Sequence, residues 1–196
     1  QDLTSSLALS ILLNGPQSFM GRKLGVLVTD GVDIDILNAL MHAVQTEGAL
    51  LETAPAVLAA YDFSDVETVV DVGGGYGALL TAILQAQPHL QGVLFEAPAV
   101  GVEAGQRLEA AGVAARCSVI GGDFFELVPA GGDAYLLQFI LYDWDDERAL
   151  TILRNCRRAM NPQSRLLLIE TLIPPDDTPT LSKLMDLEML VVCGGR

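Results

Sequence analysis

The sequence predicts an α/β fold in which a parallel sheet carries helices on both faces. From Glu67 onward, short apolar segments of strand length alternate with longer helical segments, and this alternation is typical of parallel sheets. The strand segments are apolar over most of their length, which indicates burial on both faces. A glycine-rich stretch, Val69–Gly77, joins the first of these strands to the helix that follows it.

The alternating region contains five expected strands and four expected helices. The strands are rich in Val, Ile, Leu and aromatic residues and are bounded by polar or glycine residues: Thr68–Val72, Gly92–Phe95, Cys117–Ile120, Ala134–Phe139 and Arg165–Ile169. The helices between and after them are Ala78–Gln87, Val100–Ala111, Asp146–Met160 and Leu181–Val192.

The chain before this region has a different character. We expect a helical N-terminal segment over residues 1–62 and a separate α/β domain over residues 63–196. Within the N-terminal segment the apolar spacing predicts two short elements and two longer helices: a helix at Leu7–Leu13, a strand at Leu24–Thr29, and helices at Ile34–Val44 and Ala49–Tyr61.

Composition excludes several classes of partner. The formal net charge is −14, from 25 acidic and 11 basic residues, which argues against nucleic acids and anionic membrane surfaces. Three separated cysteines and two histidines form no metal-binding pattern, so no metal is expected. Free thiols suit a reducing cytoplasm. No apolar run reaches transmembrane length.

The glycine-rich turn indicates a nucleoside cofactor. Glycine permits positive φ and close approach of a ligand to the main chain, and the following helix offers unpaired N–H groups. Asp71 precedes the turn, Gly73, Gly75 and Gly77 alternate through it, and Glu96 ends the next strand, where an acid can bind ribose hydroxyls. Dinucleotides suit this spacing less well than S-adenosylmethionine (SAM), whose ammonium and sulfonium groups favour nearby carboxylates. A tight turn without any ligand remains an alternative.

Further motifs follow in order along the chain: Asp71–Gly77, Gly121–Phe125, Tyr142–Glu147, Leu166–Glu170 and Asp186–Leu190. With these motifs, residues 55–196 resemble the SAM-dependent O-methyltransferases of the caffeate type, in particular the bacterial branch that acts on polyketide and other aromatic hydroxyls. The resemblance implies a Rossmann-like class I methyltransferase sheet with SAM at the carboxyl ends of its strands.

The resemblance also implies roles for individual cofactor-binding residues. Gly73 and Gly75 would line the methionine moiety, and Glu96 would hold the ribose hydroxyls. Asp123 and Phe124 would hold the adenine, by a hydrogen bond and an apolar ring face. These roles extend to Gln138, which stands near the adenine edge where many members have Lys, and Asp71 completes the predicted cofactor set.

The predicted catalytic position departs from the family pattern. Most members have a His that removes the proton of the acceptor hydroxyl, and here Tyr142 occupies that place. A tyrosine hydroxyl, with a pKa of about 10 in model peptides, is a poor base at neutral pH. Tyr142 could therefore orient an acceptor that ionises by itself, or it could serve only in packing. Glu170 matches a family carboxylate that orients the base.

We expect methyl transfer from SAM to a hydroxyl of a small aromatic acceptor. Two alternatives stay open: a catalytically impaired, cofactor-binding partner subunit, and a nicotinamide-dependent oxidoreductase. Residues 1–62 would be the remnant of a dimerisation region, so a homodimer is conceivable. Because the chain starts at Gln1 and stops after a predicted helix, we expect a domain lacking its C-terminal strands, with Arg165–Ile169 as an uncovered edge.

Overall fold

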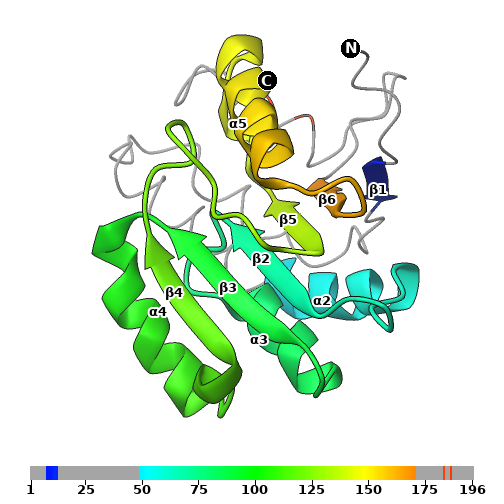
Figure 1. Ribbon diagram of the computed structural model, residues 1–196, viewed down its shortest axis with the longest axis vertical. Helices are drawn as coiled ribbons and strands as arrows, with labels where there is room; N and C mark the ends of the chain where they lie inside the picture. Colours follow the sequence, from blue (N-terminus) through cyan, green and yellow to red (C-terminus); the bar gives the residue numbers. More distant parts are fainter. Residues whose placement is uncertain (1–7, 13–48, 171–182, 184–185, 187–196) are drawn as a thin grey trace, which may run out of the picture.

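The computed structural model describes residues 8–12 and 49–170, together with Lys183 and Asp186 (Figure 1). Within these residues the chain forms a six-stranded sheet with the order β1-β6-β5-β2-β3-β4. Every paired neighbour runs parallel. The strands are β1 (Ala8–Leu12), β2 (Thr68–Val72), β3 (Gln91–Glu96), β4 (Cys117–Gly121), β5 (Ala134–Gln138) and β6 (Arg165–Glu170).

Between Ala49 and Glu170 the sheet is accompanied by four α-helices and two short 3₁₀ turns. Their bounds are α2 (Ala49–Ala60), α3 (Ala78–Ala86), α4 (Pro98–Ala110), η4 (Ala114–Arg116), η5 (Leu141–Asp143) and α5 (Asp146–Ala159). The five strands and three helices predicted between Thr68 and Ile169, and the helix predicted at Ala49–Tyr61, are confirmed to within two residues at each end. No helix in the described part of the chain has the length and apolarity needed to span a membrane.

The boundaries of α5 show why the sequence folds this way locally. Asp145 caps the helix, because its carboxylate accepts a hydrogen bond from the main-chain N–H of Arg148 at 2.9 Å. Asp146 lies in the first turn, and Arg157 and Arg158 lie in the last turn. This arrangement places negative charge at the helix N-terminus and positive charge at its C-terminus, where each interacts favourably with the helix dipole.

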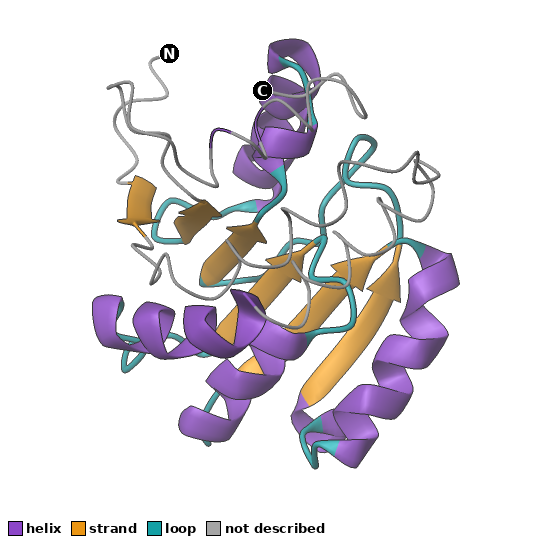
Figure 2. Cartoon of the chain, turned by 180° about the vertical axis from the view of Figure 1, so that it is seen from behind, coloured by secondary structure: helices purple, strands orange, loops and turns teal. Residues whose placement is uncertain are grey.

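The helices cover the two faces of the sheet unequally (Figures 1 and 2). One hydrophobic core joins α2, α3 and α4 to the sheet and contains Leu80, Ile83 and Leu108. A second core lies beneath α5 and contains Ile152 and Cys156. Helices on both faces confirm the fold class predicted from the sequence.

Successive strand residues alternate between these two cores. Val69 and Leu136 belong to the first core, whereas Val70, Tyr135 and Leu137 belong to the second. Since side chains in a strand point alternately to the two faces, a strand buried on both sides is apolar at most positions, and Asp71 of β2 is a buried exception. Burial on both faces explains the nearly continuous apolar runs in the sequence.

One N-terminal prediction is wrong. Residues 8–12 form strand β1, parallel to β6, rather than the helix expected at Leu7–Leu13. The edge of β6 offers unpaired main-chain groups, and pairing with them outweighs the weak helix propensity of a short segment. The expected uncovered edge at Arg165–Ile169 is wrong for the same reason. The elements predicted at Leu24–Thr29 and Ile34–Val44, and most of Leu181–Val192, lie outside the described residues.

The order of the strands creates a natural position for a ligand. The chain builds β2, β3 and β4 toward one side of the sheet and then returns to place β5 on the other side of β2. Because all strands are parallel, their arrowheads point to a common edge (Figure 1). In open α/β sheets, ligands bind at this carboxyl edge, beside the strands where the order reverses.

Candidate functional site

The glycine turn after β2 adopts a backbone that requires glycine. Gly73, Gly75 and Gly77 have φ values of 70°, 56° and 78°, a region that L side chains rarely adopt. At Gly73 space is restricted as well, because a Cβ atom would lie 2.6 Å from Cδ1 of Ile140. The main-chain N–H of Gly73 donates to the carbonyl oxygen of Phe95 at 2.8 Å, which ties the turn to β3.

Gly75 and Glu96 form the open part of this turn. A Cβ atom on Gly75 would have no atom within 4 Å, so open space lies beside it. The Glu96 carboxylate accepts hydrogen bonds from the N–H of Gly75 at 2.8 Å and from that of Ala97 at 2.7 Å. The structure thus places two predicted cofactor-binding residues, Gly75 and Glu96, in direct contact at the carboxyl ends of β2 and β3.

Asp71 carries a buried carboxyl group that has no hydrogen-bond partner. Its side chain is 1% exposed, and neither carboxyl oxygen has a partner among the described residues. Burial, together with the negative charge of Glu96, raises the pKa of Asp71 to about 7. Since a buried polar group without a partner costs about 1–3 kcal/mol, Asp71 lowers the stability of the free protein, which is a cost that a ligand-binding site can explain.

The loop after β4 places an acid and an aromatic ring beside the glycine turn. Asp123 is exposed, and its Oδ1 accepts a hydrogen bond from the N–H of Phe125 at 2.7 Å. Cε1 of Phe124 lies 3.3 Å from the position that a Cβ atom on Gly73 would occupy. Phe125 packs edge-to-face against Trp144, with ring centroids 4.8 Å apart. The structure therefore brings Asp123 and Phe124 to the same edge of the sheet as Gly73.

The end of β5 contributes Gln138 and an unusual backbone conformation. Nε2 of Gln138 is buried and has no hydrogen-bond partner among the described residues. The next residue, Phe139, has φ of 53°, which is rare for a bulky side chain. Its N–H donates to the carbonyl oxygen of Ile169 at 3.0 Å. The chain thus leaves the sheet at this point in a conformation that its neighbours hold in place.

Glu170 holds the main chain of the loop that carries Tyr142. Its Oε1 accepts hydrogen bonds from the N–H groups of Ile140 at 3.2 Å and Leu141 at 3.0 Å. Burial raises the pKa of Glu170 to about 7 despite these two bonds. Tyr142 lies in η5, with its ring 6.2 Å from that of Phe139. Glu170 and Tyr142 are therefore brought to one region, where Glu170 acts on the loop backbone.

Asp143, beside Tyr142, is a further acid in this region. Burial raises its pKa to about 6. Asp143, within η5, and Glu170, bonded to the N–H groups of Ile140 and Leu141, are thus two neighbouring acids whose pKa values burial raises.

Sequence reasoning missed three residues that shape the site. Ile140 fills the space beside Gly73, and Phe139 has positive φ; nothing in their residue types indicates either role. Asn155 bonds to two carbonyl groups of the loop after β4. Its position in the middle of a helix, where Asn is unfavourable, was a signal that could have been used.

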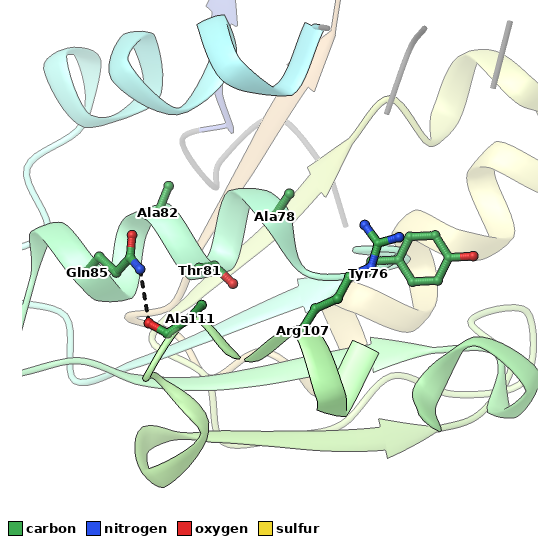
Figure 3. A pocket seen from close by; sticks show the side chains of 7 residues that line it. All are labelled: Tyr76, Ala78, Thr81, Ala82, Gln85, Arg107 and Ala111. Carbon is green, nitrogen blue, oxygen red and sulfur yellow. Dashed lines mark hydrogen bonds between the residues drawn. The ribbon is translucent and has the colours of Figure 1, made fainter. Parts of the chain in front are cut away.

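A separate hollow lies between α3 and α4 and contains none of the predicted site residues. Its volume is about 280 Å³, and its lining includes Thr81 and Gln85 of α3 and Arg107 of α4 (Figure 3). The guanidinium carbon of Arg107 lies 4.1 Å from the centroid of the Tyr76 ring. Tyr76 of the glycine turn also lines this hollow, and its other lining residues belong to α3, to α4 and to Ala111 after α4.

The polar groups and the open main chain at the carboxyl edge fit SAM. Two carboxylates, Asp71 and Glu96, suit a cationic ligand with ribose hydroxyls, and Gly75 leaves main chain open to contact. The partnerless groups of Asp71 and Gln138 are polar atoms that a ligand could satisfy. Among the described residues no three His, Cys, Asp or Glu side chains are grouped to hold a metal ion.

Comparison with known proteins agrees with this geometry. A family model for the O-methyltransferase domain matches residues 21–196. The phenazine O-methyltransferase PhzM of Lysobacter antibioticus is 51% identical over 149 residues, covering 76% of this chain and 44% of that protein. The aclacinomycin 10-hydroxylase RdmB of Streptomyces purpurascens is 38% identical over 198 residues, covering 100% of this chain and 52% of that protein.

A solved structure supplies a ligand-bound relative. The O-methyltransferase NcsB1 from neocarzinostatin biosynthesis, in complex with SAM and 2-hydroxy-5-methyl naphthoic acid, superimposes with a TM-score of 0.72 at 34% identity. The match covers 82% of this chain and 47% of that one. The chain thus spans about half the length of the relatives it matches. On both the sequence match and the shared fold, the chain belongs to the O-methyltransferase domain family.

Proposed function

We propose that this protein binds SAM at the carboxyl edge of its sheet and transfers the methyl group to a hydroxyl of a small aromatic acceptor. One observation carries the proposal: the buried carboxyl group of Asp71, which has no hydrogen-bond partner within the described chain, lies beneath a glycine turn that is open at Gly75 and bonded to Glu96. NcsB1, which shares the fold, was solved with SAM and a hydroxylated naphthoic acid, and this supports the choice of cofactor and acceptor class.

The cofactor would be held by residues from four strands. Gly73 and Gly75 offer main-chain groups, and Asp71 supplies negative charge for the cationic methionine end. Glu96 accepts hydrogen bonds from the ribose hydroxyls. On the other side of the ribose, the adenine would lie against Phe124, with Asp123 and Gln138 as its polar neighbours.

Bound SAM supplies an electrophilic methyl group on a sulfonium. The chain's contribution to the reaction is to place the acceptor oxygen beside that methyl group and to exclude water. Tyr142 is positioned for orientation rather than proton removal, since tyrosine is a weak base at neutral pH. Glu170 fixes the main chain beside Tyr142, so both residues would act mainly by positioning an acceptor acidic enough to ionise.

The test is transfer of isotope-labelled methyl from SAM to a panel of phenols and hydroxynaphthoic acids. We expect labelled product with the unaltered chain, loss of product with Asp123→Ala, and retention of product with Tyr142→Phe. Loss of turnover in Tyr142→Phe with cofactor affinity unchanged would instead assign an essential proton-transfer role to the hydroxyl. Product mass distinguishes methylation from the addition of oxygen, which matters because one relative is named a hydroxylase.

A second candidate is a cofactor-binding subunit without turnover. The Tyr at position 142 favours it, because the chain lacks the usual base at that place. SAM binding with no methylation of any acceptor in the panel would select this candidate. A homodimer is a further proposal, which sedimentation of the purified chain would test. The nicotinamide-dependent alternative rested on the glycine turn alone, and the family assignment removes that support.

A further inference from the structure

Asn155 connects α5 to the loop after β4 by two hydrogen bonds. Its side chain is 5% exposed. Nδ2 donates to the carbonyl oxygen of Phe124 at 2.9 Å and to that of Phe125 at 2.8 Å. Both amide hydrogens of Asn155 are thus directed at two consecutive peptide groups of this loop.

The orientation of the Asn155 amide is also fixed. Oδ1 accepts a hydrogen bond from Nη1 of Arg158 at 3.0 Å. Because a guanidinium can only donate, the oxygen of the amide must face Arg158 and the nitrogen must face the loop. Asn155 therefore has no equivalent flipped arrangement, and its contact with the loop is specific.

The loop segment that Asn155 holds bears the predicted adenine-binding groups. Asp123 precedes Phe124 directly, and its Oδ1 is bonded to the N–H of Phe125. The ring of Phe124 lies against Gly73 and packs edge-to-face on Phe125, with ring centroids 4.9 Å apart. Movement of the peptide groups at Phe124 and Phe125 would displace the Asp123 carboxylate and the Phe124 ring together.

We propose that Asn155 is a positioning residue that sets the adenine specificity of the cofactor site. This inference rests on the proposed function, because it presumes that Asp123 and Phe124 bind adenine. A carboxylate only accepts hydrogen bonds, so a correctly placed Asp123 favours the 6-amino group of adenine over the carbonyl of hypoxanthine. Asn155 reaches the cofactor only through the loop, and its loss weakens this discrimination more than it weakens binding in general.

The experiment compares the affinities of S-adenosylhomocysteine (SAH) and S-inosylhomocysteine by calorimetry. We expect the unaltered chain to prefer SAH by about tenfold or more, and Asn155→Ala to reduce that ratio by about threefold or more. The matched control is Ser164→Ala. Ser164 is also 5% exposed and also donates to a main-chain carbonyl, that of Gly132, but at the opposite edge of the sheet. Its loss should lower stability and leave the ratio unchanged.

An unchanged ratio in Asn155→Ala, with only the melting temperature lowered, would overturn the inference while leaving the proposed function intact. If the unaltered chain binds neither ligand, the proposed function itself fails. Should Asn155→Ala not fold, Arg158→Ala replaces it, because the Arg158 residue is exposed and its removal frees the same amide to turn. A reduced ratio in Arg158→Ala supports the role of Asn155, and an unchanged ratio in that folded variant contradicts it.

Discussion

The buried polar groups at the two edges of the sheet differ in whether they have hydrogen-bond partners. At the amino edge, Oδ2 of Asp133 accepts hydrogen bonds from the N–H groups of Glu67 at 3.0 Å and Thr68 at 2.9 Å, and Ser164 donates to Gly132. At the carboxyl edge, both oxygens of Asp71 and the side-chain nitrogen of Gln138 are buried without partners. These are the partnerless buried side-chain atoms in the described part of the chain.

The backbone conformation also differs between the two edges of the sheet. Glycines at positive φ occur at both edges, Gly73, Gly75 and Gly77 at the carboxyl edge and Gly131 at the amino edge, but the one non-glycine residue of the described chain with positive φ, Phe139 at 53°, lies at the carboxyl edge. Strained backbone and unsatisfied polar groups lower stability and persist where function requires them. The polar groups at the amino edge are satisfied within the described chain, whereas those at the carboxyl edge are left for the ligand that we propose.

The largest effect is expected from Gly73→Ala. The new Cβ atom would meet Ile140 in a backbone conformation that alanine avoids. We expect SAH affinity to fall by about 100-fold or more and stability to fall by about 2 kcal/mol, measured by calorimetry and urea unfolding. The control is Gly105→Ala in α4, where a Cβ meets no atom within 4 Å. Gly105→Ala should raise stability by about 0.5–1 kcal/mol and leave SAH affinity unchanged. A loss of SAH affinity in this variant would contradict the claim that the carboxyl edge binds the cofactor and α4 does not.

Asp71→Asn should make the protein more stable at neutral pH, because it removes a buried carboxyl group. Because the pKa of Asp71 is raised in the folded state, the protonated form is favoured, and stability falls as pH rises from about 4 to about 7. Asparagine does not titrate. The variant should therefore equal the unaltered chain near pH 4 and exceed it by about 4 kcal/mol above pH 7, at about 1.4 kcal/mol for each unit of the pKa shift.

The same Asp71→Asn variant should bind SAH about tenfold more weakly, because the ammonium group of the ligand loses a carboxylate partner. Urea unfolding at several pH values and calorimetry give the two quantities. A variant less stable than the unaltered chain at pH 8, or one that binds SAH with full affinity, would contradict the role assigned to Asp71.

Asp133→Ala should give the opposite pattern at the amino edge. Loss of the two hydrogen bonds to Glu67 and Thr68 should lower stability by about 1–2 kcal/mol. SAH affinity should stay unchanged, because Asp133 lies at the far ends of the strands from the glycine turn. A parallel loss of affinity would mean that the two edges are coupled, and the division of roles would then be wrong.

The sequence was a good guide where local pattern decides the structure. Buried strands such as Thr68–Val72 are apolar at most positions, and the turn at Gly73 must be glycine, so both could be predicted. Long-range contacts could not be predicted from the sequence. The amide of Asn155 meets carbonyl groups 30 and 31 residues earlier, and the segment Ala8–Leu12 pairs with β6 near the other end of the described chain. An Asn in the middle of a helix is unusual, but nothing in the sequence identifies the carbonyl groups or the strand with which these segments pair.

The residues of the candidate site likewise fall into those that the sequence pattern identifies and those that it does not. Residues in the glycine turn and at strand ends, such as Asp71 and Glu96, were identified from their place in the pattern. The hydrogen bonds that Glu170 accepts from the N–H groups of Ile140 and Leu141 were not identified, because a main-chain contact carries no residue-specific signal. The positive φ of Phe139 likewise results from tertiary contacts rather than from its residue type.

The most direct test of the account follows amide chemical shifts by NMR while SAH is added to the unaltered chain. We predict saturable changes at Gly73, Gly75 and the amides that follow Glu96 and Asp123, with the amides of Glu67 and Thr68 unaffected. No saturable change at the glycine turn, or changes concentrated at the amino edge, would contradict the assignment of the carboxyl edge as the cofactor site.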